Sequence, residues 1–486
     1  MILPSLKGRV EARFAHVPPH YFSLRASPNW PRACSGSGSC INRKHLPVRT
    51  ASLALDTAVD LFDAQLSAGP TALQKLLKTA SRYALSAAGP VAMSGAHFLG
   101  AVLVLHTLSP VHFGLFSFVM TVVPFCVSAA SALIGAPTTI GIRKRGHVDT
   151  AELATFQKAN LLLAVFAFAV VTASMAMSGL RLSACMLFGL YGAAMSLRWL
   201  GRVHAYATNA PARPALSDAL YGMLLVAGLG ALYLLDRMTM TYIAVVLLAA
   251  AAGSLAAFDR DYLAGQFAPS REGRLADYAP VWRDLTRWSL LGVAATELAI
   301  NAHAYFVTFF AGPGAFAVLA LGSLLMRPVA VVLQALPDME RPTMARAIGA
   351  GDFGRAYRAV KEFRTAAAAV LAATTLIAAA LLIFFSSLVL KQGYDASSAA
   401  VILAIWVLIM AVRALRTPDA VFLQAAGEFQ SLAAIGTKAS IVSLASTLVL
   451  LFAFGPVASL LGIVAGDIAM TAGIFAKTRS WKLAHG

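Results

Sequence analysis

Charged side chains are scarce in this sequence. Asp, Glu, Lys and Arg make up 13% of the 486 residues, whereas soluble globular domains carry about 25%. Hydrophobic residues account for 59% of the chain, and the mean hydropathy is +0.72. This composition excludes an ordinary soluble protein and predicts a chain that crosses a membrane many times.

Cysteine is also rare, with four residues in the whole chain, and these form no disulfide framework. Cys34 and Cys40 lie in a polar leader without nearby Cys or His partners, whereas Cys126 and Cys185 fall inside apolar runs. We expect all four to be reduced, structural thiols. His and carboxylate residues nowhere show the spacing of metal ligands, so the sequence predicts no metal and no other cofactor.

Motifs of the common catalytic and nucleotide-binding sites are absent. The sequence contains no G-x-x-x-x-G-K-[ST], H-E-x-x-H, C-x-x-C or G-x-S-x-G. The predicted external loops, each under about a dozen residues, leave no room for an outward-facing catalytic domain. We therefore expect a protein that is not an enzyme. The competing class, a membrane-embedded glycan polymerase or ligase, would need a long external loop.

Long apolar runs recur from Tyr83 onward and predict about twelve transmembrane helices. A helix needs roughly 20 apolar residues to cross about 30 Å of hydrocarbon. The predicted spans are 83–106, 113–138, 159–180, 182–204, 216–235, 238–258, 286–310, 312–336, 365–389, 396–424, 431–454 and 456–477.

The excess of positive charge, +17 in total, follows the alternation of the predicted loops. Alternate connections hold 27 Lys and Arg residues on one side and three on the other, Arg181, Arg237 and Lys391. Because cytoplasmic loops carry the excess of these residues, both termini are predicted to be cytoplasmic, in a cell inner (plasma) membrane protein. The charge is thus explained by topology, and we expect no nucleic-acid partner.

The chain divides into a leader and two similar halves. Arg82 with the following YALSAAG resembles Arg287 with the following WSLLGVA, 205 residues later. We expect an all-α fold with two six-helix lobes of the same orientation. The leader is basic and poor in acids, as in an unstructured tail or an organellar transit peptide, and it ends in an amphipathic surface segment. The predicted parts are the leader 1–80, the first lobe 81–258, a cytoplasmic linker 259–285 and the second lobe 286–486.

Glu297 is the most prominent acidic residue at membrane depth. Asn301 follows at i+4 and Tyr305 at i+8, so a carboxylate, an amide and a phenol share one helix face. This face predicts either a proton-accepting or cation-coordinating site at Glu297, for a coupling ion, or an internal pair that joins two helices. Asn301 is also a candidate for binding substrate in a central cavity.

Arg327 lies in the middle of the eighth predicted span, followed by Pro328. A guanidinium stays charged when buried and suits phosphate oxygens, so Arg327 is a candidate ligand of an anionic substrate. Pairing with Glu297 is the alternative. Four further arginines lie in the cytoplasmic halves of the fourth and tenth spans, either at the mouth of a substrate cavity or as snorkelling anchors. They are Arg198, Arg202, Arg413 and Arg416.

Asp467 follows a G-x-x-x-G motif, Gly462 and Gly466, which predicts close packing of the twelfth helix against a neighbour. The carboxylate is either a second coupling-ion candidate or a polar lock between helices. Asp218 is interpreted as a helix N-terminal charge. His97 is interpreted as a hydrogen-bonded packing residue.

Three stretches carry a resemblance to a known family. They are SRYALSAAGPVAMSGAHFLGAVLVLHTLSPVHFGLFSFVM, LRWLGRVHAYATNAPARPALSDALYG and ALPDMERPTMARAIGAGDFGRAY. Together with the twelve spans, they resemble the polysaccharide (O-antigen type) flippases of the MOP exporter superfamily, over about residues 80–480.

This resemblance implies a V-shaped pair of lobes that alternately opens a cationic cavity. The implied substrate is an undecaprenyl-diphosphate-linked oligosaccharide, moved from the cytoplasmic to the periplasmic leaflet. The implied partners are this lipid-linked oligosaccharide, the bilayer, and polysaccharide polymerase and export machinery. Within the superfamily, a lipid II flippase and a cation-coupled multidrug exporter remain alternatives. The exporters commonly place an acid in the first span, which this sequence lacks, although Glu297 could substitute for it.

Overall fold

The computed structural model describes residues 92–135, 137–138, 149–208, 210–268, 273–384 and 396–485. All of them belong to one compact unit, Ala72–Gly486. The predicted leader, 1–80, lies outside the described residues, and so do Cys34 and Cys40. The described cysteines, Cys126 and Cys185, are free and buried.

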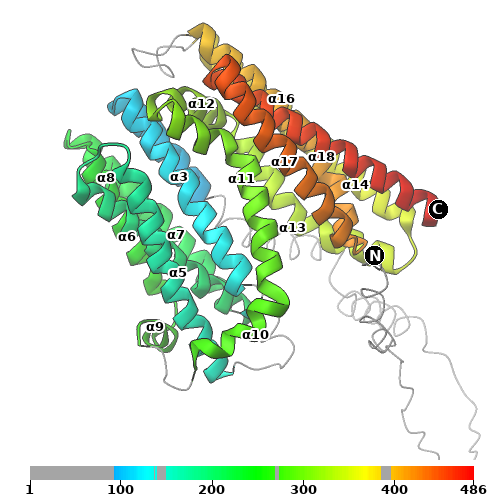
Figure 1. The fold of residues 1–486 in the computed structure, drawn as a ribbon, viewed down its shortest axis with the longest axis horizontal. Helices are drawn as coiled ribbons and strands as arrows, with labels where there is room; N and C mark the ends of the chain where they lie inside the picture. The colour runs from blue at the N-terminus through cyan, green and yellow to red at the C-terminus, as the bar shows by residue number, and fades with distance from the viewer. Residues whose placement is uncertain are drawn as a thin grey trace, which may run out of the picture. The chain divides into compact units, whose positions relative to one another are not determined.

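The fold is all-helical, and the described residues contain no strand. The first half begins with a helix at Ala92–Thr107. It continues with α3 (Pro110–Ala130), the π-helical turn η3 (Ser131–Gly135), α5 (Thr150–Ala176), α6 (Leu182–Ala207), α7 (Ala212–Leu234) and α8 (Met240–Ser254) (Figure 1).

A linker of short helices leads into the second half. The linker contains η4 (Leu255–Ala257), α9 (Arg260–Phe267), η5 (Leu275–Tyr278), α10 (Ala279–Val281) and the π-helical turn η6 (Trp282–Thr286). The second half consists of α11 (Arg287–Phe310), α12 (Pro313–Leu325), α13 (Arg327–Gly349), α14 (Phe353–Phe384), α16 (Ala396–Ala425), α17 (Phe429–Phe454) and α18 (Pro456–His485) (Figure 1).

The chain is a polytopic membrane protein. Within the described ranges, nine helices are long and apolar enough to cross a bilayer, and α12 with α13 makes a tenth, bent by 57°. The helix Ala92–Thr107 is shorter, and α6 carries arginines that lower its hydropathy. Taken with these two, the helices follow the order of the twelve predicted spans.

One predicted connection is largely helical instead. We expected a basic loop between the spans 312–336 and 365–389, but α13 runs on to Gly349 and α14 already begins at Phe353. Only the short turn between them is non-helical, and Gly351 adopts a φ of 73° there. Hydropathy identifies only the apolar part of a helix. Polar turns that extend the same helix beyond the hydrocarbon are not detected by it.

The two halves repeat the same order of helices. The helices α3 and α12 begin at Pro110 and Pro313, which are 203 residues apart. The helices α5 and α14 begin at Thr150 and Phe353, at the same offset of 203 residues. Local signals define these starts: Ser109 caps α3 by accepting a hydrogen bond from His112 N, and proline occupies the first turn of both α3 and α12.

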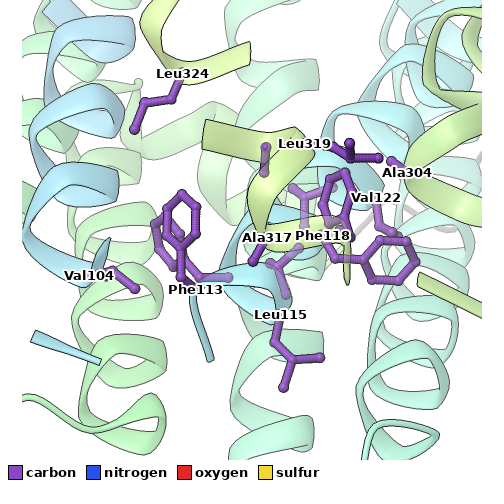
Figure 2. Packing of buried hydrophobic residues seen from close by; sticks show 14 of the residues in the cluster. Val104, Phe113, Leu115, Phe118, Val122, Ala304, Ala317, Leu319 and Leu324 are labelled. Carbon is purple, nitrogen blue, oxygen red and sulfur yellow. The ribbon is translucent and has the colours of Figure 1, made fainter. Parts of the chain in front are cut away.

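Packing between the halves centres on α3, which contacts both α11 and α12. Phe118 packs edge-on against Tyr305 of α11 and Phe316 of α12. Figure 2 shows this shared apolar core, with Phe113, Leu115, Phe118, Val122, Ala304, Ala317, Leu319 and Leu324 among its labelled side chains. Lipid is as apolar as these side chains, so close van der Waals packing rather than the hydrophobic effect joins the helices.

Small residues allow the closest helix contacts. An added Cβ at Gly114 of α3 would lie 1.9 Å from the carbonyl oxygen of Pro313 in α12. At Gly462 of α18 it would lie 2.3 Å from the backbone nitrogen of Thr447 in α17, and at Gly466 it would lie 2.4 Å from Ser443 Cβ. The predicted close packing at the G-x-x-x-G motif is therefore confirmed, with α17 as the neighbour.

The linker is attached to the first half. Arg213 donates to Asp259 (2.7 Å) and holds the pKa of that carboxyl below its usual value. The Tyr278 hydroxyl donates to Leu133 O (2.7 Å) in η3 and lies 3.0 Å from Thr286 Oγ1 in η6, so it bridges two π-helical turns. Burial raises the pKa of Tyr278, which keeps this donor protonated. Such turns often mark functional positions in helices.

Candidate functional site

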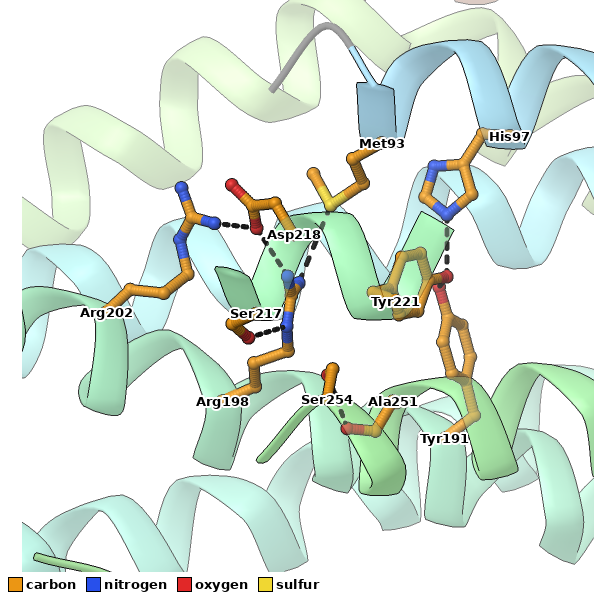
Figure 3. A network of polar contacts seen from close by, with 10 residues as sticks. All are labelled: Met93, His97, Tyr191, Arg198, Arg202, Ser217, Asp218, Tyr221, Ala251 and Ser254. Carbon is orange, nitrogen blue, oxygen red and sulfur yellow. Dashed lines mark hydrogen bonds and ion pairs between the residues drawn. The ribbon is translucent and has the colours of Figure 1, made fainter. Parts of the chain in front are cut away.

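The first cluster of buried charge joins α6 to α7. Asp218 of α7 accepts hydrogen bonds from the guanidinium groups of both Arg198 and Arg202, which lie one turn apart on α6 (Figure 3). Arg198 also donates through Nε to Ser217 Oγ (2.9 Å) and through Nη1 to the sulfur of Met93 (3.5 Å). Arg198 is 2% exposed and Asp218 is fully buried.

Aromatic side chains extend this cluster toward the first helix. The Arg198 guanidinium lies over the ring of Tyr221, 5.0 Å from its centroid. The Tyr221 hydroxyl lies 2.7 Å from His97 Nε2 and 3.1 Å from the hydroxyl of Tyr191 (Figure 3). His97 is thus a hydrogen-bonded packing residue, as interpreted from the sequence. The cluster ties the helix Ala92–Thr107 to α6 and α7.

The second cluster joins α16 to α18. Asp467 of α18 accepts from Arg413 Nε at Oδ2 (2.8 Å) and from Arg416 Nη2 at Oδ1 (2.7 Å). Arg416 also donates to the sulfur of Met470. All three charged side chains are largely buried, and they line a cavity of about 60 Å³ between α11, α16, α17 and α18.

The structure therefore buries the four paired arginines against aspartates of neighbouring helices. Arg198 and Arg202 were expected at a cavity mouth or as snorkelling anchors, and they lie instead in an internal ion-pair cluster. Asp467 forms the interhelical lock that was one of its two sequence interpretations. A buried charge must find a partner because transfer out of water costs several kcal/mol for an ion.

Arg327 differs from the other four arginines. It is the first residue of α13, at the 57° break after α12, where Pro328 cannot donate a backbone hydrogen bond. The side chain is partly exposed, and among the described residues no carboxylate lies within ion-pair distance of it. It is near enough to His97 and Tyr191 to act on them electrostatically. Arg327 is thus a cation without a carboxylate partner among the described residues, within electrostatic range of two polar side chains of the first half.

Glu297 lies where the halves meet, and it does not pair with Arg327. Its carboxylate accepts from Ser128 Oγ of α3 (2.7 Å) and from Asn301 Nδ2 one turn further along α11 (3.2 Å). The predicted common face of Glu297, Asn301 and Tyr305 lies toward α3, where Tyr305 packs against the rings of Phe118 and Phe125. The Tyr305 hydroxyl is buried without a partner among the described residues.

Sequence reasoning missed the partners of these groups. Asp218 was interpreted as a charge at the helix N-terminus, and this is wrong: α7 begins at Ala212, Asp218 lies beyond its first turn, and the carboxylate pairs with Arg198 and Arg202 of α6. Ser128 and Tyr221 were not singled out, because a serine or a tyrosine in an apolar run is unremarkable. Among the described residues, no group of three His, Cys, Asp or Glu side chains could hold a metal ion.

Comparison with solved structures identifies the class of fold. The chain has the fold of MOP-superfamily transporters. An inward-facing multidrug resistance MATE family transporter matches with a TM-score of 0.60 and 14% identity, over 81% of this chain and 95% of that one. No protein-family model matches the sequence, and no curated protein shows significant sequence similarity.

Two further structures share this fold. The lipid II flippase MurJ, in an inward closed conformation, matches with a TM-score of 0.62 and 10% identity, over 81% of this chain and 87% of that one. A MOP-superfamily transporter from Pyrococcus furiosus, described as having a binding pocket of reverse polarity, matches with a TM-score of 0.54 and 12% identity, over 83% and 95%. Identities this low establish a common fold.

Proposed function

We propose that this protein is a transporter that moves a lipid-linked, diphosphate-bearing oligosaccharide from the cytoplasmic to the outer leaflet of the membrane. The observation that carries the proposal is Arg327, a guanidinium at membrane depth without a carboxylate partner among the described residues. The MOP transporter fold supports it. The O-antigen type of substrate rests on the sequence resemblance.

A diphosphate head group cannot cross hydrocarbon without compensation of its charge. Arg327 lies at the break between α12 and α13, within electrostatic range of the polar groups His97 and Tyr191 of the first half. A guanidinium there can form two parallel hydrogen bonds with phosphate oxygens. The polyprenyl tail would remain in the lipid while the head group passes between the halves.

The paired arginines have a different role in this proposal. Arg198, Arg202, Arg413 and Arg416 share two aspartates, so each cluster keeps one net positive charge. These charges make the electrostatic potential between the halves more positive, which attracts an anionic substrate without direct contact with it. Ligation of the substrate is assigned to Arg327 alone.

Reconstituted transport tests this function. In proteoliposomes, the protein should flip a fluorescent polyprenyl diphosphate lipid, followed by quenching from the outside. We expect Arg327→Ala to slow flipping roughly 10- to 100-fold, since a hydrogen bond to a charged group contributes about 1.5–3 kcal/mol. Arg327→Lys should retain part of the rate, because lysine keeps the positive charge but cannot form two parallel hydrogen bonds with a phosphate group.

The matched control is Arg237→Ala, an exposed arginine in the turn before α8, which should flip lipid at the parent rate. If the Arg327→Ala protein flips lipid at the parent rate when present at the same abundance, Arg327 does not bind the substrate. Uptake of a cationic drug, with no movement of the diphosphate lipid, would replace the proposed function with multidrug export.

Glu297 supports a second candidate function, cation-coupled export. Its carboxylate bridges α11 to Ser128 of α3, where loss or gain of a proton or cation would change the contact between the halves. Glu297→Gln should keep the hydrogen bond with Ser128. If transport is driven by a cation gradient, this variant should lower the gradient-driven transport rate at least tenfold.

The control for this variant is Glu428→Gln, which removes a carboxylate bonded to Lys477 and Ser431 outside the spans. Its rate should match the parent rate. Unchanged gradient dependence in Glu297→Gln would reduce Glu297 to a structural link between α3 and α11.

A further inference from the structure

Two helices at equivalent places in the two halves differ in shape. The helix α3 is continuous from Pro110 to Ala130, although Pro124 lies inside it (Figure 1). Its counterpart in the second half is divided into α12 and α13, which meet at an angle of 57° beside Pro328. The repeat offset of 203 residues places Pro124 at the position of Arg327, next to Pro328. The equivalent position is therefore continuous in one half and broken in the other.

Pro124 weakens α3 at this point. A proline inside a helix has no N–H to donate to the carbonyl four residues earlier, here Met120 O, and its ring crowds that carbonyl. Sharp bends in helices occur mostly at prolines and a few other defects. The Pro124 side chain is exposed, so a change of angle there does not have to move a buried ring. The helix α3 can therefore bend at Pro124 more easily than elsewhere along its length.

The contacts of α3 with the second half lie on both sides of Pro124. Before it, Gly114 lies against the backbone of Pro313 in α12. After it, Ser128 donates to Glu297 of α11, and the following turn η3 packs against α11 as well. A rigid α3 would couple these two contacts, whereas a helix that bends at Pro124 can release the first and keep the second.

The helix α3 also packs against α5 and α6 of its own half. When the halves separate on one side of the membrane, α3 must leave either these two helices or the second half on that side. A bend at Pro124 lets residues 110–123 move with α5 and α6 while residues 125–135 stay on α11. Alternating access requires such a movement, because the two sides of a transporter open in turn.

We propose that Pro124 is a hinge of α3. During transport, residues 110–123 swing away from α12 about Pro124, and the contact of Ser128 with Glu297 is kept. The hinge rests on the proposed transport function but not on the identity of the substrate. Bending can be measured without substrate, so a failure of the hinge and a failure of the proposed function are distinguishable.

The distance between two spin labels on α3 measures the bend directly, by double electron–electron resonance. In a protein without the four native cysteines, labels at Val111→Cys and Ser131→Cys flank Pro124, and neither position is buried. A straight helix places these positions about 30 Å apart, and a bend like that between α12 and α13 would shorten the distance by about 3 Å. We expect both distances in proteoliposomes. Gly114→Ala should raise the population of the shorter one, because its Cβ pushes α3 away from Pro313.

Substitutions of Pro124 test the hinge itself. Proline disfavours an unbroken helix roughly 100-fold relative to alanine, so Pro124→Ala should remove most of the shorter distance and slow lipid flipping about tenfold or more. It should also raise Tm, since the straight helix gains a hydrogen bond. Pro124→Gly should keep part of the bending and of the rate, because glycine also weakens a helix.

The matched control is Pro342→Ala. Pro342 is likewise exposed and inside a helix, α13, which packs against α14 and α16 of its own half. This variant should leave the two distances on α3 and the flipping rate unchanged.

Three results would overturn the hinge. They are the longer distance alone in both the parent protein and Gly114→Ala, an unchanged distance distribution in Pro124→Ala, and equal effects of Pro124→Ala and Pro342→Ala. If Gly114→Ala fails to fold, the comparison of the parent protein with Pro124→Ala still decides. A protein that bends at Pro124 but does not flip the diphosphate lipid would support the hinge and contradict the proposed substrate.

Discussion

Replacing Asp218 by alanine is expected to lower the free energy of unfolding by about 3–5 kcal/mol. The substitution leaves Arg198 and Arg202 buried on α6 without their shared carboxylate. Arg198 cannot escape to water, because its side chain is 2% exposed and is held by Ser217, Met93 and the ring of Tyr221. An uncompensated buried charge is among the most destabilising defects in a protein.

Unfolding by SDS in mixed micelles measures this change, followed by circular dichroism. The control is Asp261→Asn, an exposed carboxylate of α9 that should shift stability by less than about 0.5 kcal/mol. A rescue variant sharpens the test: Asp218→Leu with Arg198→Met and Arg202→Leu should recover most of the loss, because apolar replacement of a buried ion pair is often neutral. A small effect of Asp218→Ala alone would contradict the buried cluster.

Gly114→Ala is expected to disrupt the contact between the two halves. The new Cβ would lie 1.9 Å from Pro313 O and 2.7 Å from Pro313 C, and a backbone carbonyl cannot rotate away as a side chain can. Overpacking costs about 1–3 kcal/mol even where side chains yield. We therefore expect a cost above about 3 kcal/mol for the described conformation and a shift of the population away from it.

A pair of introduced cysteines reports this shift. Val111 Cγ2 lies 3.4 Å from the position of a Cβ at Gly314, so Val111→Cys with Gly314→Cys should cross-link across α3 and α12. In a background without the four native cysteines, adding Gly114→Ala should lower cross-linking several-fold. Gly230→Ala on α7, where an added Cβ meets nothing within 4 Å, should leave it unchanged. Equal cross-linking in all three proteins would contradict the close contact of α3 with α12 at Gly114.

Cross-linking also bears on transport. The Gly114 contact lies at the end of the bundle that the charge pattern predicts to be external, and the Ser128–Glu297 bond lies further along α3. If the halves separate at α3 and α12 during transport, oxidation of the double variant Val111→Cys, Gly314→Cys should stop lipid flipping. Reduction of the engineered disulfide should then restore the rate.

Hydropathy and charge alone determined the positions of the helices and their order. A helix crosses a bilayer only if about 20 of its residues are apolar, so each span can be recognised from its own stretch of sequence. The observed helices α6 (Leu182–Ala207) and α16 (Ala396–Ala425) therefore match the predictions 182–204 and 396–424 closely. Spacing likewise identified both arginine pairs as neighbours on one helix face.

Only the tertiary structure decided which groups meet. Arg198 pairs with Asp218 on the next helix, whereas Arg413 pairs with Asp467 on a helix two positions further along the chain, although α6 and α16 both correspond to the fourth predicted span of their half. Pairing of Glu297 with Arg327 was one expectation, but the packing places Glu297 against Ser128 and leaves Arg327 without a carboxylate partner among the described residues. Such partners depend on which helices lie side by side, and that is set by contacts between residues far apart in sequence.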